Sequence, residues 1–121
     1  MEQKNNFTHL QEKIAQLVKE RDWEKFHSPK NVSIDIAGEA AELMEHFKWL
    51  NDQESFEILN KKRKEIEEEI ADVFISALSF CNATHIDPEK VILAKLEEIK
   101  AKYPIDKAKG KSLKYTEYKK E

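Results

Sequence analysis

Glycine, proline and cysteine are scarce in this chain of 121 residues, which contains two Gly, three Pro and one Cys. A fold rich in β-structure needs many turns, and turns depend on Gly and Pro, so this scarcity argues against such a fold. A single cysteine excludes a disulfide framework within the chain. Because Cys81 lies in an apolar stretch, we interpret it as a small core residue.

Long apolar runs and a strong net charge are missing as well. The apolar run 70–81 is too short for a bilayer, which needs about 20 residues, and the polar N-terminus does not resemble a signal peptide. The formal net charge is -3, so no global field directs the chain to a nucleic-acid polymer or an anionic membrane. We therefore expect a cytoplasmic protein with neither kind of partner.

The residues that are present favour helices. Hydrophobic residues make up 40% of the chain and charged residues 37%, a composition typical of a globular protein with a charged exterior. Apolar residues recur at helical spacing, and no strand pattern persists. We predict an all-α fold in one domain, 1–121, with a lysine-rich tail at about 105–121 and a polar connection or weak helix over 51–60. The four predicted helices cover about 8–23, 31–50, 61–83 and 87–103.

The stretch 65–81, EIEEEIADVFISALSFC, is the most informative part of the sequence. On a helical wheel its apolar residues cover nearly the whole circumference, as in a buried helix. Its polar residues form one narrow stripe of Glu65, Glu69, Asp72, Ser76 and Ser79. Buried carboxylates are costly unless they are paired or bind a metal, so we expect a cation opposite Glu69 and Asp72.

A second pair of carboxylates, Glu39 and Glu42, lies at the edge of the buried face of the helix predicted over 31–50. The i, i+3 spacing puts the carboxylates of each pair on one side of their helix, so two packed helices can aim four of them at one point. All-oxygen ligands favour a hard ion, Mg²⁺ or alternatively Mn²⁺, and such a site serves phosphoryl chemistry. For Glu39 and Glu42, chance occurrence in a glutamate-rich helix is the alternative.

The two carboxylate pairs and several further segments resemble one family. The segments GEAAELMEHFKW and EEEIADVFISAL resemble the MazG-like nucleoside triphosphate pyrophosphohydrolases, all-α enzymes defined by ExxE, a spacer and ExxD. Four further segments resemble the dCTP pyrophosphatase branch in the same order along the chain: ERDWEKFHSPKN, HIDP, KYP and KYTE. The resemblance extends from about Leu10 to Glu117.

This resemblance implies a four-helix MazG-like bundle that binds Mg²⁺ through Glu39, Glu42, Glu69 and Asp72. It implies cleavage of a deoxynucleoside triphosphate, dCTP-like first, between the α- and β-phosphates, giving a monophosphate and pyrophosphate in nucleotide-pool sanitation. The implied mechanism is attack of water on the α-phosphorus, and Glu39 is our candidate for the residue that orients or deprotonates that water. Relatives form dimers or tetramers built from two dimers, so we expect a homotetramer arranged as a dimer of dimers.

The resemblance also implies a set of substrate contacts. These are Trp23, Phe26, His27, Trp49, Ser76, Lys95 and Tyr103. Trp23, His27 and Trp49 correspond to the base pocket of the dCTP branch, where an aromatic face stacks on a nucleobase and a His binds its edge. Lys95 and Tyr103 are candidate phosphate contacts. For several of these residues, an ordinary packed or solvated side chain is the alternative.

Three residues depart from the pattern of the branch. Ser76 stands where the relatives have Tyr, Ile14 replaces a pocket His, and Ile99 replaces an Asn. These departures leave the metal chemistry intact and predict a looser base pocket that accepts other pyrimidine or purine deoxynucleotides.

Two other functions stay open. One is a carboxylate di-iron protein, for which Glu24-x-x-His27 supplies one of two required E-x-x-H motifs. The other is a non-enzymatic helical interaction module.

Overall fold

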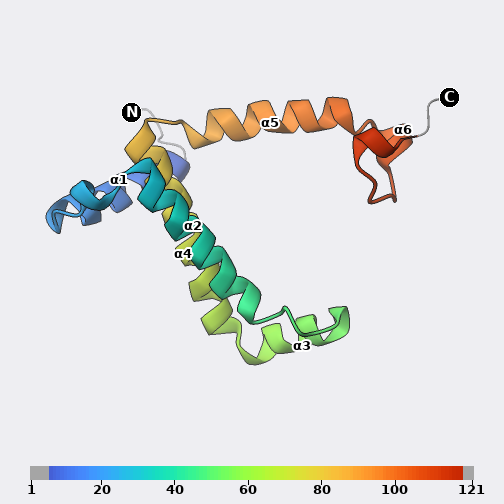
Figure 1. Cartoon of the computed structure of the whole chain (residues 1–121), viewed down its shortest axis with the longest axis horizontal. Coiled ribbons are helices and arrows are strands. Elements are labelled where there is room, and N and C mark those ends of the chain that lie inside the picture. The colour runs from blue at the N-terminus through green and yellow to red at the C-terminus, as the bar shows by residue number, and fades with distance from the viewer. Residues whose placement is uncertain (1–5, 119–121) are drawn as a thin grey trace. The chain divides into compact units, whose positions relative to one another are not determined.

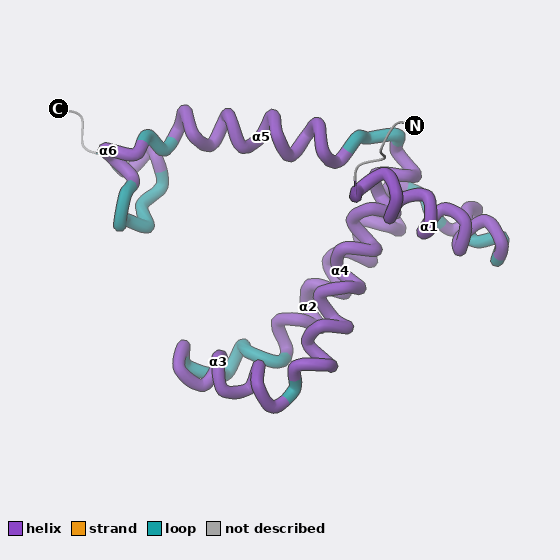
Figure 2. Tube along the Cα trace, turned by 180° about the vertical axis from the view of Figure 1, so that it is seen from behind, coloured by secondary structure: helices purple, strands orange, loops and turns teal. Residues whose placement is uncertain are grey.

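The computed structural model of the chain describes residues 6–118, which form helices, turns and loops without a strand. Within this range, six α-helices and two short 3₁₀ helices follow one another (Figures 1 and 2). Their bounds are α1 (Asn6–Glu20), η1 (Glu24–Phe26), α2 (Pro29–Glu45), α3 (Asp52–Lys61), α4 (Arg63–Thr84), α5 (Pro88–Lys102), α6 (Ile105–Ala108) and η2 (Tyr115–Glu117). The all-α prediction is confirmed, whereas the predicted number of four helices is wrong.

Helix α3 is the main addition, and its start is specified by a local signal. The side chain of Asn51 accepts a hydrogen bond from the backbone N–H of Glu54 at 2.9 Å, and the Glu54 carboxylate accepts one from the N–H of Asn51 at 3.0 Å. This reciprocal capping box satisfies two backbone donors at the helix start. A full helix was not predicted over 51–60, because this polar segment has no continuous apolar stripe after its cap.

The chain divides into two compact units, Met1–Ile86 and Asp87–Glu121. In the first unit, α2 and α4 lie side by side along their lengths, and α1 and α3 each pack against α4 (Figures 1 and 2). Helix α2 starts at Pro29 directly after Ser28, whose hydroxyl accepts the N–H of Asn31 at 3.1 Å. The core of this unit is small, and Val32 at 1% exposure is its most buried side chain.

Helix α1 is joined to α4 by apolar and polar contacts. Val18 is the buried residue of α1. The Gln11 side chain donates to Asn82 Oδ1 at 3.0 Å, and Asn82 Nδ2 donates to the carbonyl oxygen of Gln11 at 3.1 Å. Two hydrogen bonds between the same residues fix the register of α1 on α4.

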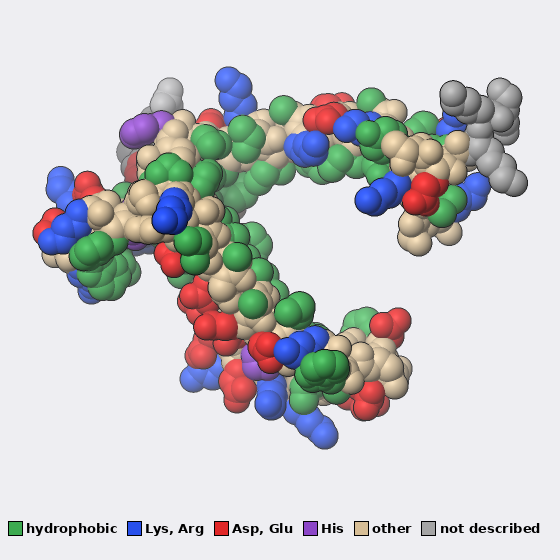
Figure 3. All heavy atoms as spheres, in the orientation of Figure 1, with side chains coloured by type: hydrophobic (Ala, Val, Ile, Leu, Met, Phe, Trp, Pro, Cys, Tyr) green, Lys and Arg blue, Asp and Glu red, His purple; other side chains and the backbone are tan. Residues whose placement is uncertain are grey.

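Helix α4 is less buried than its sequence predicts. Only Ile66, Leu78 and Ser79 are buried among its residues, while Phe74 is 58% exposed. The helix has partners on part of its circumference, so an apolar face of this unit stays uncovered in the single chain. Apolar side chains are also visible on other helices in the space-filling view (Figure 3).

The second unit consists of α5, α6 and η2. The ring of Tyr103 at the end of α5 meets the rings of Tyr115 and Tyr118 edge-on, with centroids 5.9 and 6.0 Å apart. On α5, Glu98 pairs with Lys102 at 2.9 Å and with Lys95 at 3.3 Å. Among residues 6–118, no helix has the length and apolar character needed to cross a membrane.

Candidate metal centre and adjoining pocket

Four carboxylates from α2 and α4 meet at one point. One oxygen from each of Glu39, Glu42, Glu69 and Asp72 lies within 4.8 Å of the others. Since the members of each pair are three residues apart, they project from one side of their helix, and the close packing of α2 against α4 brings the pairs together. Acidic side chains are visible over this helix pair in Figure 3.

The two carboxylates deepest in this cluster each have one oxygen without a hydrogen-bond partner. Oε2 of Glu39 and Oε2 of Glu69 are buried and accept no hydrogen bond in the structure. Burial raises the pKa of Glu39, and the neighbouring Glu42, Asp72 and Glu69 raise it further. Burial likewise raises the pKa of Glu69, as do Glu42 and Asp72. Burial and the neighbouring negative charges both disfavour the ionised form of these carboxylates. Four ionised carboxylates at one point are therefore electrostatically unfavourable without a cation.

One basic group lies beside the cluster. Nε2 of His46 is 3.9 Å from Oε1 of Glu69, and this proximity acts to lower the pKa of Glu69. His46 follows Glu42 by four residues, so it lies one turn further along the same side of the chain. Sequence reasoning missed His46, although its spacing from Glu42 was visible in the sequence.

The donor set fits a divalent cation. All four groups offer carboxylate oxygens, two of those oxygens are buried without a hydrogen bond, and one imidazole cannot neutralise four charges. Hard cations prefer carboxylate oxygen ligands, and a bound cation would reverse the unfavourable charge balance of the cluster. The cluster is therefore compatible with divalent-metal binding.

A cavity of about 300 Å³ lies one helical turn from the cluster. Its wall includes Asp35 and Ser76. Asp35 precedes Glu39 by four residues on α2, and Ser76 follows Asp72 by four on α4, so each is displaced by roughly 6 Å along its helix. The two helices therefore run antiparallel, with the cluster and the cavity as successive layers between them. We call this cavity the α2–α4 pocket.

The end of α1 places an aromatic ring at the α2–α4 pocket. Asp22 adopts the left-handed conformation with φ of 55°, its N–H donates to the Lys19 carbonyl at 3.1 Å, and the N–H of Trp23 donates to the Val18 carbonyl at 3.0 Å. This is a Schellman motif, which brings the residue after the turn back against the last helical turn. Trp23 and Val18 accordingly both line the pocket.

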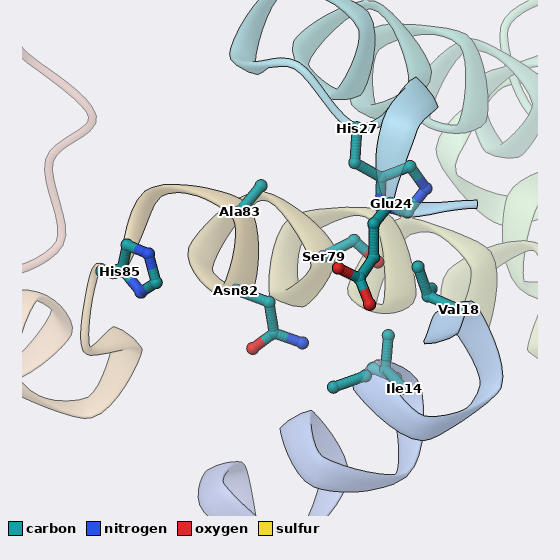
Figure 4. A pocket seen from close by; sticks show the side chains of 9 residues that line it. Ile14, Val18, Glu24, His27, Ser79, Asn82, Ala83 and His85 are labelled. Atoms are coloured by element: carbon teal, nitrogen blue, oxygen red, sulfur yellow. The ribbon is translucent and has the colours of Figure 1, made fainter. Parts of the chain in front are cut away.

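A second cavity, of about 400 Å³, adjoins the first (Figure 4). Glu24, Asn82 and His85 are among the side chains around it, while His27 lines both cavities. The segment that carries His27 is held by Asn31, whose Nδ2 donates to the carbonyl of Phe26 at 3.1 Å. The two cavities thus form one hollowed region bordered by α1, η1 and α4.

Comparison with known proteins identifies the family of the chain that carries this cluster and pocket. A family model described as MazG-like matches residues 33–118, a range that contains all four carboxylates of the cluster. The chain belongs to the MazG-like family. The resemblance inferred from the sequence motifs is thereby confirmed.

Curated relatives and a solved structure agree with this assignment. The MazG-like chain is 33% identical over 105 residues to dCTP pyrophosphatase 1 of Rattus norvegicus and 34% identical over 105 residues to that of Homo sapiens. Each alignment covers 85% of this chain but 62% of the relative, so the chain spans about three-fifths of the length of these relatives. The crystal structure of a pyrophosphatase from Archaeoglobus fulgidus matches with a TM-score of 0.81 and 36% identity, covering 86% of this chain and 97% of that chain.

The predicted site residues of this MazG-like chain are distributed over several places. The four predicted metal ligands come together, and three predicted substrate contacts, Trp23, His27 and Ser76, line the α2–α4 pocket. Phe26 is 57% exposed, lies outside the lining of that pocket, and has Lys25 Nζ 5.5 Å from its ring centroid.

Three other predicted contacts are not among the residues that line that pocket. Trp49 follows the end of α2, is 85% exposed, and has Lys48 Nζ 5.2 Å from its ring centroid. It lies beyond the cluster along α2, whereas the pocket lies before it. Lys95 and Tyr103 belong to the second unit, where they contact Glu98 and the tyrosine rings described above.

Proposed function

We propose that this chain is a Mg²⁺-dependent pyrophosphohydrolase that cleaves a deoxynucleoside triphosphate between its α- and β-phosphates. The observation that carries the proposal is the carboxylate cluster set one helical turn from an aromatic-lined pocket. A nucleoside triphosphate has the same two parts, a highly charged chain and an aromatic base, separated by a sugar. Membership of the MazG-like family and similarity to pyrophosphatases support this choice.

The residues of the chain have distinct tasks in the proposed reaction. Glu39, Glu42, Glu69 and Asp72 would hold Mg²⁺, which when bound neutralises phosphate charge and lowers the pKa of a water molecule. Glu39 is the proposed general base, with Oε2 as the atom that takes the proton from the attacking water. That oxygen accepts no hydrogen bond in the structure, so no other donor occupies it.

The base of the nucleotide is assigned to the α2–α4 pocket. The Trp23 ring offers a stacking face, and the half-buried His27 and Ser76 offer hydrogen-bonding groups. We propose a dCTP-like nucleotide as the first substrate, in line with the names of the curated relatives. Four further residues stay proposed substrate contacts, although none of them lines the α2–α4 pocket: Phe26, Trp49, Lys95 and Tyr103.

A homotetramer is the proposed assembly. Phe74 at 58% exposure and Trp49 at 85% exposure leave large apolar surfaces on the first unit, and burying such surfaces is the main driving force for association. Light scattering coupled to size exclusion would give the mass in solution. A monomeric mass at micromolar concentration would contradict the proposed assembly.

The reaction is tested by a panel of deoxynucleotides and nucleotides in Mg²⁺, with the products resolved as monophosphate and pyrophosphate. Asp72→Asn should lower kcat/KM by more than about 100-fold, because losing even a residue that only orients a metal ligand costs 10- to 100-fold. Glu68→Gln is the matched control, since Glu68 is exposed on the same helix outside the cluster. Full activity of Asp72→Asn, or release of orthophosphate in place of pyrophosphate, would refute the proposed reaction.

A further inference from the structure

The α2–α4 pocket contains one acceptor-only side chain, Asp35. Much of the pocket wall is apolar, with Leu17, Val32 and Ile75 among its residues, so a polar group there has a strong effect on what binds. Asp35 is a solvent-exposed residue of the pocket wall. No hydrogen bond or ion pair engages its side chain within residues 6–118, including with Lys13 in the same wall.

The register of α2 on α4 places Asp35 at the level of the base. Glu39, one turn further along α2, belongs to the carboxylate cluster, and Ser76 lines the pocket one turn beyond Asp72 on α4. Asp35 and Ser76 therefore belong to the same layer between the antiparallel helices. A nucleotide with its phosphates at the cluster would bring its base to this layer, between these polar groups and Trp23.

The hydrogen-bonding chemistry of Asp35 and Ser76 can distinguish cytosine from uracil and thymine. A carboxylate only accepts hydrogen bonds, whereas a hydroxyl both donates and accepts. Cytosine carries an amino donor at C4 next to the acceptor N3, so it can donate to Asp35 while accepting from Ser76. Uracil and thymine carry a carbonyl at C4, which would place an acceptor against the Asp35 carboxylate and leave both without a partner.

We propose that Asp35 determines base specificity, selecting cytosine over uracil and thymine by accepting a hydrogen bond from the 4-amino group. This inference rests on the proposed function for its placement of the base in the α2–α4 pocket. Ser76 supports the selection by donating to N3. The unpaired acceptors in a uracil complex correspond to a preference on the order of tenfold, since Asp35 is exposed and water relieves part of the penalty.

The test compares kcat/KM for dCTP and dUTP in wild type and in Asp35→Asn, whose amide can donate to a carbonyl. The ratio of kcat/KM for dCTP over dUTP should fall by about tenfold in Asp35→Asn. Asp52→Asn is the matched control, because it makes the same change on the exposed first turn of α3 and should leave the ratio unchanged. A purely structural role of Asp35 would lower both values together and leave the ratio unchanged, which would overturn the proposal.

Equilibrium binding of dCMP and dUMP without metal separates this inference from the proposed reaction. If no nucleotide is hydrolysed but dCMP binds more tightly than dUMP in a manner that requires Asp35, the base assignment holds and the reaction is wrong. If dCTP is hydrolysed and Asp35→Asn keeps the wild-type ratio, the reaction holds and the base assignment is wrong. Asp35→Ala, checked by its thermal unfolding, serves as a second variant with the acceptor removed, and it should likewise lose the preference.

Discussion

Replacing Val32 by alanine should destabilise the protein more than any single change on the exposed side of α2. Val32 of α2 is 1% exposed and also lines the α2–α4 pocket. The change removes the equivalent of two methylene groups, or about 1.6 kcal/mol of burial at about 0.8 kcal/mol each. The cavity left behind adds to this, so the expected loss is about 2–3 kcal/mol in the free energy of unfolding.

Ile34→Ala provides the matched comparison. Ile34 is on the same helix and is 58% exposed, so its truncation removes more atoms but less buried surface. We expect it to cost less than about 1 kcal/mol. Urea unfolding of both variants, followed by circular dichroism, gives the two free energies, and the thermal midpoint of Val32→Ala should fall by about 10 °C.

A loss for Ile34→Ala that equals or exceeds the loss for Val32→Ala would refute this reasoning. It would mean that the exposed side of α2 is covered by another copy of the chain in solution. The concentration dependence of unfolding identifies this case, because a dissociating oligomer unfolds at lower denaturant when it is dilute.

Three further outcomes are expected. Asn82→Ala removes both hydrogen bonds to Gln11 and should cost about 1–3 kcal/mol, with faster hydrogen exchange in α1 as its signature; unchanged exchange there would contradict the role given to this pair. Gly38→Ala should stabilise by about 0.8–1 kcal/mol in thermal unfolding, since a Cβ at this helical position meets nothing within 4 Å, and a loss of stability would indicate a neighbour on that face. In EDTA, the stability of wild type relative to Glu69→Gln should fall as pH rises above the ordinary glutamate pKa, and Mg²⁺ should remove that fall.

The sign of this pH dependence follows from the raised pKa values. Burial and the neighbouring carboxylates raise the pKa of Glu39 and of Glu69 above the ordinary glutamate value, so the folded state holds protons that the unfolded state has lost. Stability is then lost as pH rises from the ordinary glutamate pKa, about 4.3, through the raised values. A relative stability that increases over this range in EDTA would contradict the raised pKa values of Glu39 and Glu69.

Much of the site was predictable from local pattern. The i, i+3 spacing of Glu39 with Glu42 and of Glu69 with Asp72 identified both pairs, because helical spacing alone puts each pair on one side. Ser76 belongs to the polar stripe of α4 and was predicted as a substrate contact from the family resemblance, and it lines the pocket with Trp23. The helix count was less predictable, since α3 starts from a cap at Asn51 without a clear apolar stripe.

The sequence by itself determined the helical class, the family and the four carboxylates, because these depend on spacing along a single helix and on motifs that persist in a linear chain. Only the tertiary structure decided which residues share a layer. The antiparallel register of α2 on α4 placed Asp35 with Ser76, and the Schellman turn at Asp22 carried Trp23 to them. Register and turn geometry depend on packing between helices, and helical spacing within one element does not specify them.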